Sequence, residues 1–118
     1  MGLEMTELMR RFNGAFQQHD PKALESLVAE ECFIENTTPA PNGSPHEGRQ
    51  ACLELWQGIA SNRDVRFELE DTEVFGDFAV IRWRFCWGHS EADSVRGVNL
   101  MRAKHGLIVE ARGYVKGS

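Results

Sequence analysis

The segment from Val80 to Trp87 alternates between two kinds of side chain. Arg82 and Arg84 occupy even positions. The odd positions carry large apolar side chains: Ile81, Trp83, Phe85 and Trp87. A period of two is that of a β-strand whose faces meet different surroundings. Three large rings on one face must pack into a core or line an apolar pocket. We therefore predict that the aromatic face looks inward and the arginine face outward.

The size and charge of the chain limit the classes of protein to which it can belong. Its 118 residues fit one domain, 1–118, with a core that needs no disulfide or metal. The net charge of −5, without a cluster of lysines and arginines, argues against a nucleic-acid partner. The apolar runs are too short to span a bilayer, so we expect no membrane partner. The three cysteines are expected to be reduced and buried, and the protein to be cytoplasmic.

Helical periodicity is confined to the first half of the chain. It predicts three helices, at 6–19, from Asp20-Pro21 onward, and from residue 47 or 48 to about 61. A short strand is expected at 32–36 and a loop at 38–48. The second half alternates as strands at 65–75, 79–87, 94–104 and 107–115, with a tight turn at His105-Gly106. The pattern predicts an α+β domain, with three N-terminal helices packed on a curved antiparallel sheet.

Four segments, in this order and spacing, resemble one known superfamily. They are Phe16–Asp20 with Ala23-Leu24, Gly48-Arg49, Val80–Phe85 and Val98–Glu110. The chain resembles the nuclear transport factor 2-like superfamily, and more narrowly its SnoaL-like and ketosteroid-isomerase-like branches. The resemblance implies a cone-shaped α+β barrel, an apolar cavity between sheet and helices, and frequent homodimers. Because the superfamily includes isomerases, cyclases, epoxide hydrolases, dehydratases and binding domains, the reaction must be inferred from the pocket residues.

The residues at the ketosteroid-isomerase positions argue against that mechanism. The resemblance places Asn36 at the position of the base and Asn99 at that of the neutral acid, where the mechanism needs carboxyl groups. Phe12 and Trp56 stand where tyrosines are expected. An amide cannot accept a proton near neutral pH, so isomerisation by that mechanism is not expected. Asn99 can still donate a hydrogen bond to a carbonyl oxygen. Alternatively, both amides bond backbone groups or buried water.

Two other side chains are candidates for proton transfer. If the strand register differs by one residue, Glu35 and not Asn36 faces the cavity, and burial would raise its pKa. His46 lies in the proline-rich loop expected over the mouth of the cone, and histidine titrates near neutral pH. An epoxide-hydrolase mechanism is not expected, because Gly113 follows Arg112 where that branch has an aspartate.

These arguments define a set of expected site residues. The candidate catalytic residues are Glu35, His46 and Asn99. The expected ligand-binding residues are Phe12, Asn36, Trp56, Trp83, Phe85, Met101 and Gly113. The histidines are scattered and no carboxylates cluster beside them, so we expect neither a metal nor a cofactor.

The opposite face of the predicted sheet has the composition of a protein interface. Its residues are Arg82, Arg84, Val98, Leu100, Arg102, Glu110, Arg112 and Tyr114. We expect a homodimer through this outer face, with a solvated face of cross-strand ion pairs as the alternative. For the cavity we expect a small hydrophobic, oxygenated ligand, with or without cyclase- or isomerase-like proton transfer. The alternatives are a non-catalytic binding or dimerisation module, and a cone plugged by its own tryptophans.

Overall fold

The computed structural model describes residues 3–117. Their elements are α1 Met5–Gln17, the 3-10 helix η1 Pro21–Leu24, β1 Val28–Glu35, β2 Pro45–Glu47, α2 Arg49–Ser61, β3 Arg66–Phe75, β4 Phe78–Cys86, the 3-10 helix η2 Glu91–Asp93, β5 Ser94–Lys104 and β6 Leu107–Val115. The predicted α+β class is confirmed, and the four long strands lie within a residue or two of their predicted positions. None of the described helices is long and apolar enough to cross a membrane.

The six strands form one mixed sheet in the order β2-β1-β6-β5-β4-β3. Neighbouring strands are antiparallel except β1 and β6, which run parallel. The prediction of a purely antiparallel sheet was therefore wrong. Hairpin turns fix the directions of β3 to β6, but β1 pairs with a strand far away in the sequence. Since no turn joins β1 to β6, local sequence signals do not set their relative direction.

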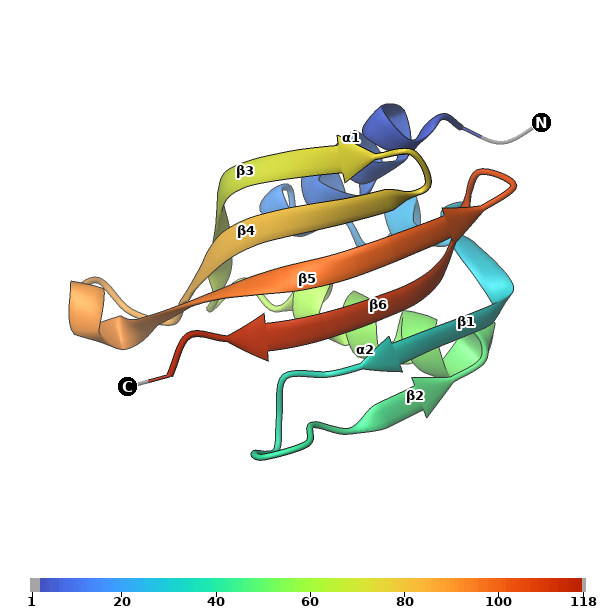
Figure 1. Cartoon of the computed structure of the whole chain (residues 1–118). Coiled ribbons are helices and arrows are strands. Elements are labelled where there is room, and N and C mark those ends of the chain that lie inside the picture. Colours follow the sequence, from blue (N-terminus) through green and yellow to red (C-terminus); the bar gives the residue numbers. More distant parts are fainter. Residues whose placement is uncertain (1–2, 118) are drawn as a thin grey trace.

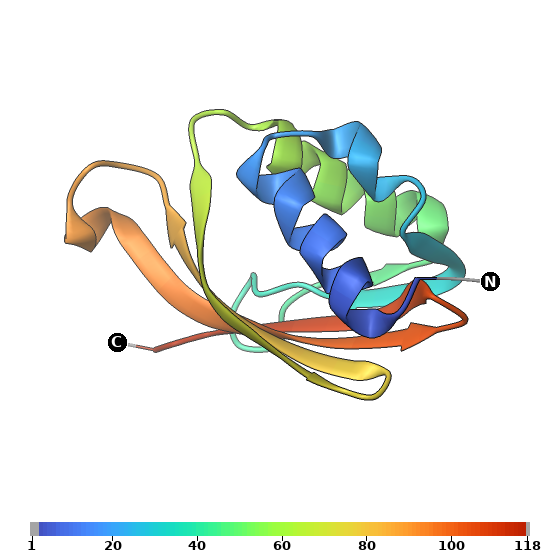
Figure 2. The same ribbon diagram turned by 90° about the horizontal axis from the view of Figure 1, so that it is seen from above.

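The helices lie on one face of this sheet, which bends around them (Figure 2). In Figure 1 they lie behind the strands, and the opposite face of β3 to β6 is uncovered. The prediction of three N-terminal helices needs correction, because the second is only the four-residue η1. The amide of Ile108 donates to the Leu27 carbonyl at 2.8 Å. Sheet pairing thus uses a backbone group that a longer helix would need.

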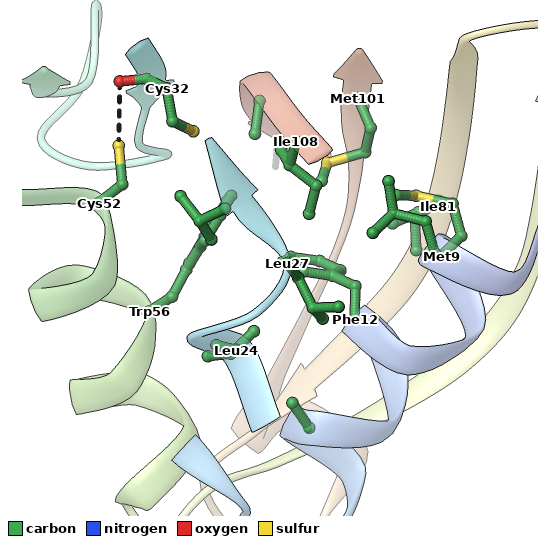
Figure 3. Packing of buried hydrophobic residues seen from close by; sticks show 14 of the residues in the cluster. Met9, Phe12, Leu24, Leu27, Cys32, Cys52, Trp56, Ile81, Met101 and Ile108 are labelled. Atoms are coloured by element: carbon green, nitrogen blue, oxygen red, sulfur yellow. Dashed lines mark hydrogen bonds between the residues drawn. The ribbon is translucent and has the colours of Figure 1, made fainter. Parts of the chain in front are cut away.

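Both α-helices turn an apolar stripe toward the sheet. In α1 the buried residues are Met5, Leu8, Met9, Phe12, Ala15 and Phe16. This spacing of three and four residues puts them on one side of the helix. In α2 the buried residues are Cys52, Leu53, Trp56 and Ala60. Together with Leu24, Leu27, Ile81, Met101 and Ile108 they form the core (Figure 3). Each fully buried aliphatic side chain contributes about 1.5–3 kcal/mol to folding.

The cysteines are free and buried, as predicted. The Cys52 thiol on α2 donates to the Cys32 carbonyl on β1 at 3.4 Å (Figure 3). Burial raises the pKa of the Cys32 thiol far above its usual value. The Cys52 thiol therefore links α2 to β1, and the buried Cys32 thiol is a poor nucleophile.

Strand β4 confirms the predicted alternation. Ala79, Ile81 and Trp83 are buried on the helix side. Arg82 and Arg84 point to the other side, where Arg82 forms ion pairs with Asp71 and Glu73. The aromatic face therefore lies toward the helices, and the arginine face is the outer face of the sheet.

Candidate functional site

A cavity of about 480 Å³ lies between the helices and the concave face of the sheet. Seven aromatic side chains line it: Phe12, Phe16, Trp56, Phe67, Trp83, Phe85 and Trp87. It opens where β4 ends and β5 begins, since Leu69, Trp87 and Val115 line it and are 40–50% exposed. A cavity of this size is within the range of small-molecule sites.

The aromatic rings hold one another in place. The centroids of Phe12 and Trp56 lie 4.9 Å apart, and those of Phe67 and Trp83 lie 5.5 Å apart, both edge to face. This geometry is a favourable one for aromatic pairs. The rings are thus fixed by contacts with each other and with the core. The tryptophans form the walls of the cavity, and the space between them is open.

Trp83 is closely packed against β5. It is 7% exposed and stands opposite Gly97 on β5. A Cβ atom at Gly97 would lie 2.5 Å from Cη2 of the indole, so the ring occupies the space that any other residue would fill. The indole N–H donates to Oδ1 of Asn99, at 3.2 Å. The ring and its polar group are therefore both anchored on β5.

Asn99 lies in the middle of β5, between Ile81 and Gly113 of the neighbouring strands. It lines the cavity, as does Gly113. Its Oδ1 accepts the Trp83 hydrogen bond, and within residues 3–117 its Nδ2 has no partner. A Cβ atom at Gly113 would lie 3.2 Å from the Asn99 oxygen and 2.8 Å from the Thr37 methyl group. Because Gly113 has no side chain, the Asn99 amide oxygen and the Thr37 methyl group can both lie close to its backbone.

The register of β1 decides which of Glu35 and Asn36 points inward. Ile34 is buried and lines the cavity, so Glu35 follows on the outer side and Asn36 on the inner side. Glu35 borders the cavity, but its carboxylate accepts a hydrogen bond from Nη1 of Arg112 at 3.3 Å. Nε of Arg112 also donates to the Glu110 carboxylate at 2.8 Å, and this hydrogen bond raises the pKa of the Arg112 guanidinium. Asn36 lines the cavity.

Two expected site residues lie outside the cavity lining. His46 is on β2 opposite Ile34, and its Nε2 lies 3.1 Å from the Ser44 hydroxyl oxygen. Met101 faces inward but is fully buried in the core between Ala79 and Ala111. Of the expected site, the structure brings together Phe12, Asn36, Trp56, Trp83, Phe85, Asn99 and Gly113, with Glu35 at the border.

Several lining residues were not predicted, among them Asn13, Phe16, Phe67, Leu69 and Val95. Phe16 lies one helical turn after Phe12, and Phe67 continues the alternation of its strand, so the same periodicities could have found both. Among the described lining residues, Glu35 is the only one with an ionisable side chain. Within residues 3–117, no group of three histidine, cysteine or acidic side chains is arranged to hold a metal ion.

Comparison with known proteins identifies the family to which this architecture corresponds. The sequence matches the family model described as the SnoaL-like domain over residues 9–111. No functionally curated protein matches it. Among solved structures, it is similar to an NTF2-like protein of unknown function from Mesorhizobium loti. The two share 60% identity over 96% of this chain and 91% of that chain, with a TM-score of 0.89.

More distant structures share the fold. A putative polyketide cyclase from Sinorhizobium meliloti is 21% identical over 91% of this chain and 93% of its own, with a TM-score of 0.72. A putative ketosteroid isomerase from Kribbella flavida is 16% identical over 95% of this chain and 77% of its own, with a TM-score of 0.79. At such identities the similarity shows the fold alone.

Proposed function

Because this chain belongs to the SnoaL-like domain family, we propose that it binds a neutral, hydrophobic, oxygen-containing small molecule in the cavity between its helices and its sheet. The family resemblance found in the sequence is confirmed by the match over residues 9–111. The observation that carries the proposal is the composition of the cavity wall. Seven aromatic side chains line about 480 Å³, and the one ionisable side chain bonds an arginine of the outer face.

The wall favours an apolar ligand that carries no charge. Each square ångström of apolar surface that a ligand buries contributes about 25 cal/mol to binding. A carboxylate in this cavity would lose its hydration without meeting a cation, which is costly. The nearby cation, Arg112, is already paired with Glu35 and Glu110. The side chains of Asn36 and Asn99 supply polar groups for an oxygen of the ligand.

The same wall favours binding over proton transfer. A general base must come within hydrogen-bond reach of the proton that it removes. The Glu35 carboxylate is bonded to Arg112, and the His46 imidazole is bonded to Ser44 outside the cavity. The amides of Asn36 and Asn99 cannot take a proton near neutral pH. We therefore favour a binding protein, with a cyclase- or isomerase-like reaction through Glu35 as the alternative.

We further propose that the outer face of the sheet pairs with a second copy of the chain. The described helices all cover the other face (Figure 1). Tyr114 is 50% exposed there, and Val98 and Leu100 are half-buried. Arg102 and Arg112 both form ion pairs with Glu110 on this face, so these charges are already balanced within each copy and can lie against a second copy related by a two-fold axis. The cytoplasmic location stays a prediction from composition.

Filling the cavity tests the proposed function. Equilibrium dialysis with 2-acetylnaphthalene, a neutral aromatic ketone, measures Kd for the wild type and for Val95→Trp, which adds a ring at the cavity. The matched control, Val98→Trp, adds the same ring to the outer face of the same strand. We expect Val95→Trp to raise Kd about tenfold, as overpacking does, and Val98→Trp to leave it unchanged. No binding by the wild type, or an equal loss in both variants, would contradict the proposal.

A further inference from the structure

The hydrogen bond between Trp83 and Asn99 has a direction that determines what the cavity offers to a ligand. We propose that Trp83 is a positioning residue that holds the Asn99 amide in one orientation, so that the site selects ligands with a carbonyl oxygen over ligands with a hydroxyl group at that point. This inference rests on the proposed function, since it concerns a ligand in the same cavity.

The orientation follows from the chemistry of the two side chains. An asparagine amide can rotate to present either its oxygen or its NH₂ group, whereas an indole nitrogen can only donate. The 3.2 Å contact with Nε1 of Trp83 therefore requires the Asn99 oxygen. A flipped amide would place N–H against N–H and lose the bond. The Nδ2 group is left facing the cavity, and within the described chain no other group accepts from it.

The indole can impose this orientation because it is itself immobile. Gly97 provides the space for its six-membered ring, with a hypothetical Cβ only 2.5 Å from Cη2. The Phe67 ring packs against it edge to face, with centroids 5.5 Å apart. A ring held on both sides cannot swing away to release the amide. The donor at Asn99 is thus fixed by a stack that runs from β3 through β4 to β5.

A fixed donor discriminates between ligand oxygens. A ketone oxygen accepts from Nδ2 and has no hydrogen of its own to satisfy. A hydroxyl oxygen can also accept, but its own hydrogen then needs an acceptor, and the Asn99 oxygen is already bonded to the indole. Leaving a buried donor unsatisfied is costly, so the alcohol binds more weakly than the ketone of the same shape.

Two matched probes test the inference. They are 2-acetylnaphthalene and 1-(2-naphthyl)ethanol, which share a ring system and differ in the carbonyl or hydroxyl group. Equilibrium dialysis should show the wild type binding the ketone about tenfold more tightly than the alcohol. In Trp83→Phe an aromatic ring remains but the indole N–H is lost, so the amide is free to rotate. We expect the ratio of the two affinities to fall toward one.

A control separates positioning from packing. Trp87→Phe makes the same change in the same segment, at the cavity mouth, but Trp87 has no hydrogen bond to Asn99. Any change that it makes should shift both affinities together and leave the ratio about tenfold. A wild-type ratio near one, or a ratio unchanged in Trp83→Phe, overturns the inference while ketone binding upholds the proposed function. If neither probe binds the wild type, both proposals fail.

Discussion

The Glu35 carboxylate lies 3.3 Å from Nη1 of Arg112, on the outer side of the sheet, whereas the next residue, Asn36, lines the cavity. The two residues stand opposite each other on the parallel strands β1 and β6. The ion pair thus reports the strand register, which determines whether Glu35 or Asn36 reaches the cavity. Proton transfer would need a free Glu35 carboxylate at the ligand, whereas simple binding would not.

Replacing Glu35 distinguishes the two readings of the cavity. We expect Glu35→Gln to leave the Kd for 2-acetylnaphthalene within about twofold of the wild type, because its carboxylate does not face the ligand. The lost pair is partly exposed, so the free energy of unfolding should fall by less than about 1 kcal/mol. Dialysis and urea denaturation measure the two quantities. A large loss of ketone affinity with stability unchanged would place the Glu35 side chain at the ligand.

A charge on the outer face tests the proposed dimer. Leu100 lies half-buried in the middle of this face, opposite Val80 and Arg112 on the neighbouring strands. Leu100→Asp would bury a charged carboxylate, with its cost of desolvation, in a sheet-to-sheet interface, so sedimentation should show monomers where the wild type shows dimers. The matched control is Leu69→Asp at the cavity mouth, which should sediment with the same mass as the wild type. A wild-type monomer, or a Leu100→Asp dimer, would contradict the proposal.

The first helix carries a pH-dependent contribution to stability. Hydrogen bonds from Arg10 and Arg11 lower the pKa of Glu7 to about 2. A carboxyl group with a depressed pKa in the folded state stabilises it above the pKa of the unfolded chain, near 4, and this stabilisation is lost as the pH falls toward 2. Glu7→Gln should therefore lower Tm slightly at pH 7, and the difference from the wild type should shrink as the pH falls from 4 through 2. Thermal unfolding followed by circular dichroism measures both. A difference in Tm that is equally large at pH 7 and at pH 2 would assign the effect to something other than this charge.

Much of the fold could be predicted because its signals are local. Alternation along 79–87 indicated which face is inward, and the structure confirms this with Ile81 and Trp83 buried and Arg82 ion-paired outside. The prediction of a long second helix was wrong because a non-local hydrogen bond, from the Ile108 amide to the Leu27 carbonyl, decides where the helical turn ends. Neither residue's neighbours in the sequence signal that bond.

The site was harder to predict than the fold, because facing inward does not mean lining the cavity. Met101 and Asn99 point to the same side of β5, yet Met101 lies in the packed core and Asn99 at the open space. The position along the strand separates them, and no periodicity encodes it. The bond from Trp83 to Asn99 joins residues sixteen apart, and it depends on the strand pairing that also places Trp83 over Gly97.

The chain contains three tryptophans, and all of them border the one space described above. The tryptophan emission of the protein therefore originates entirely at that space. Libraries of unlabelled compounds can be screened by fluorescence alone, without dyes or engineered reporters. A change in the emission wavelength or intensity reports that a compound has bound there.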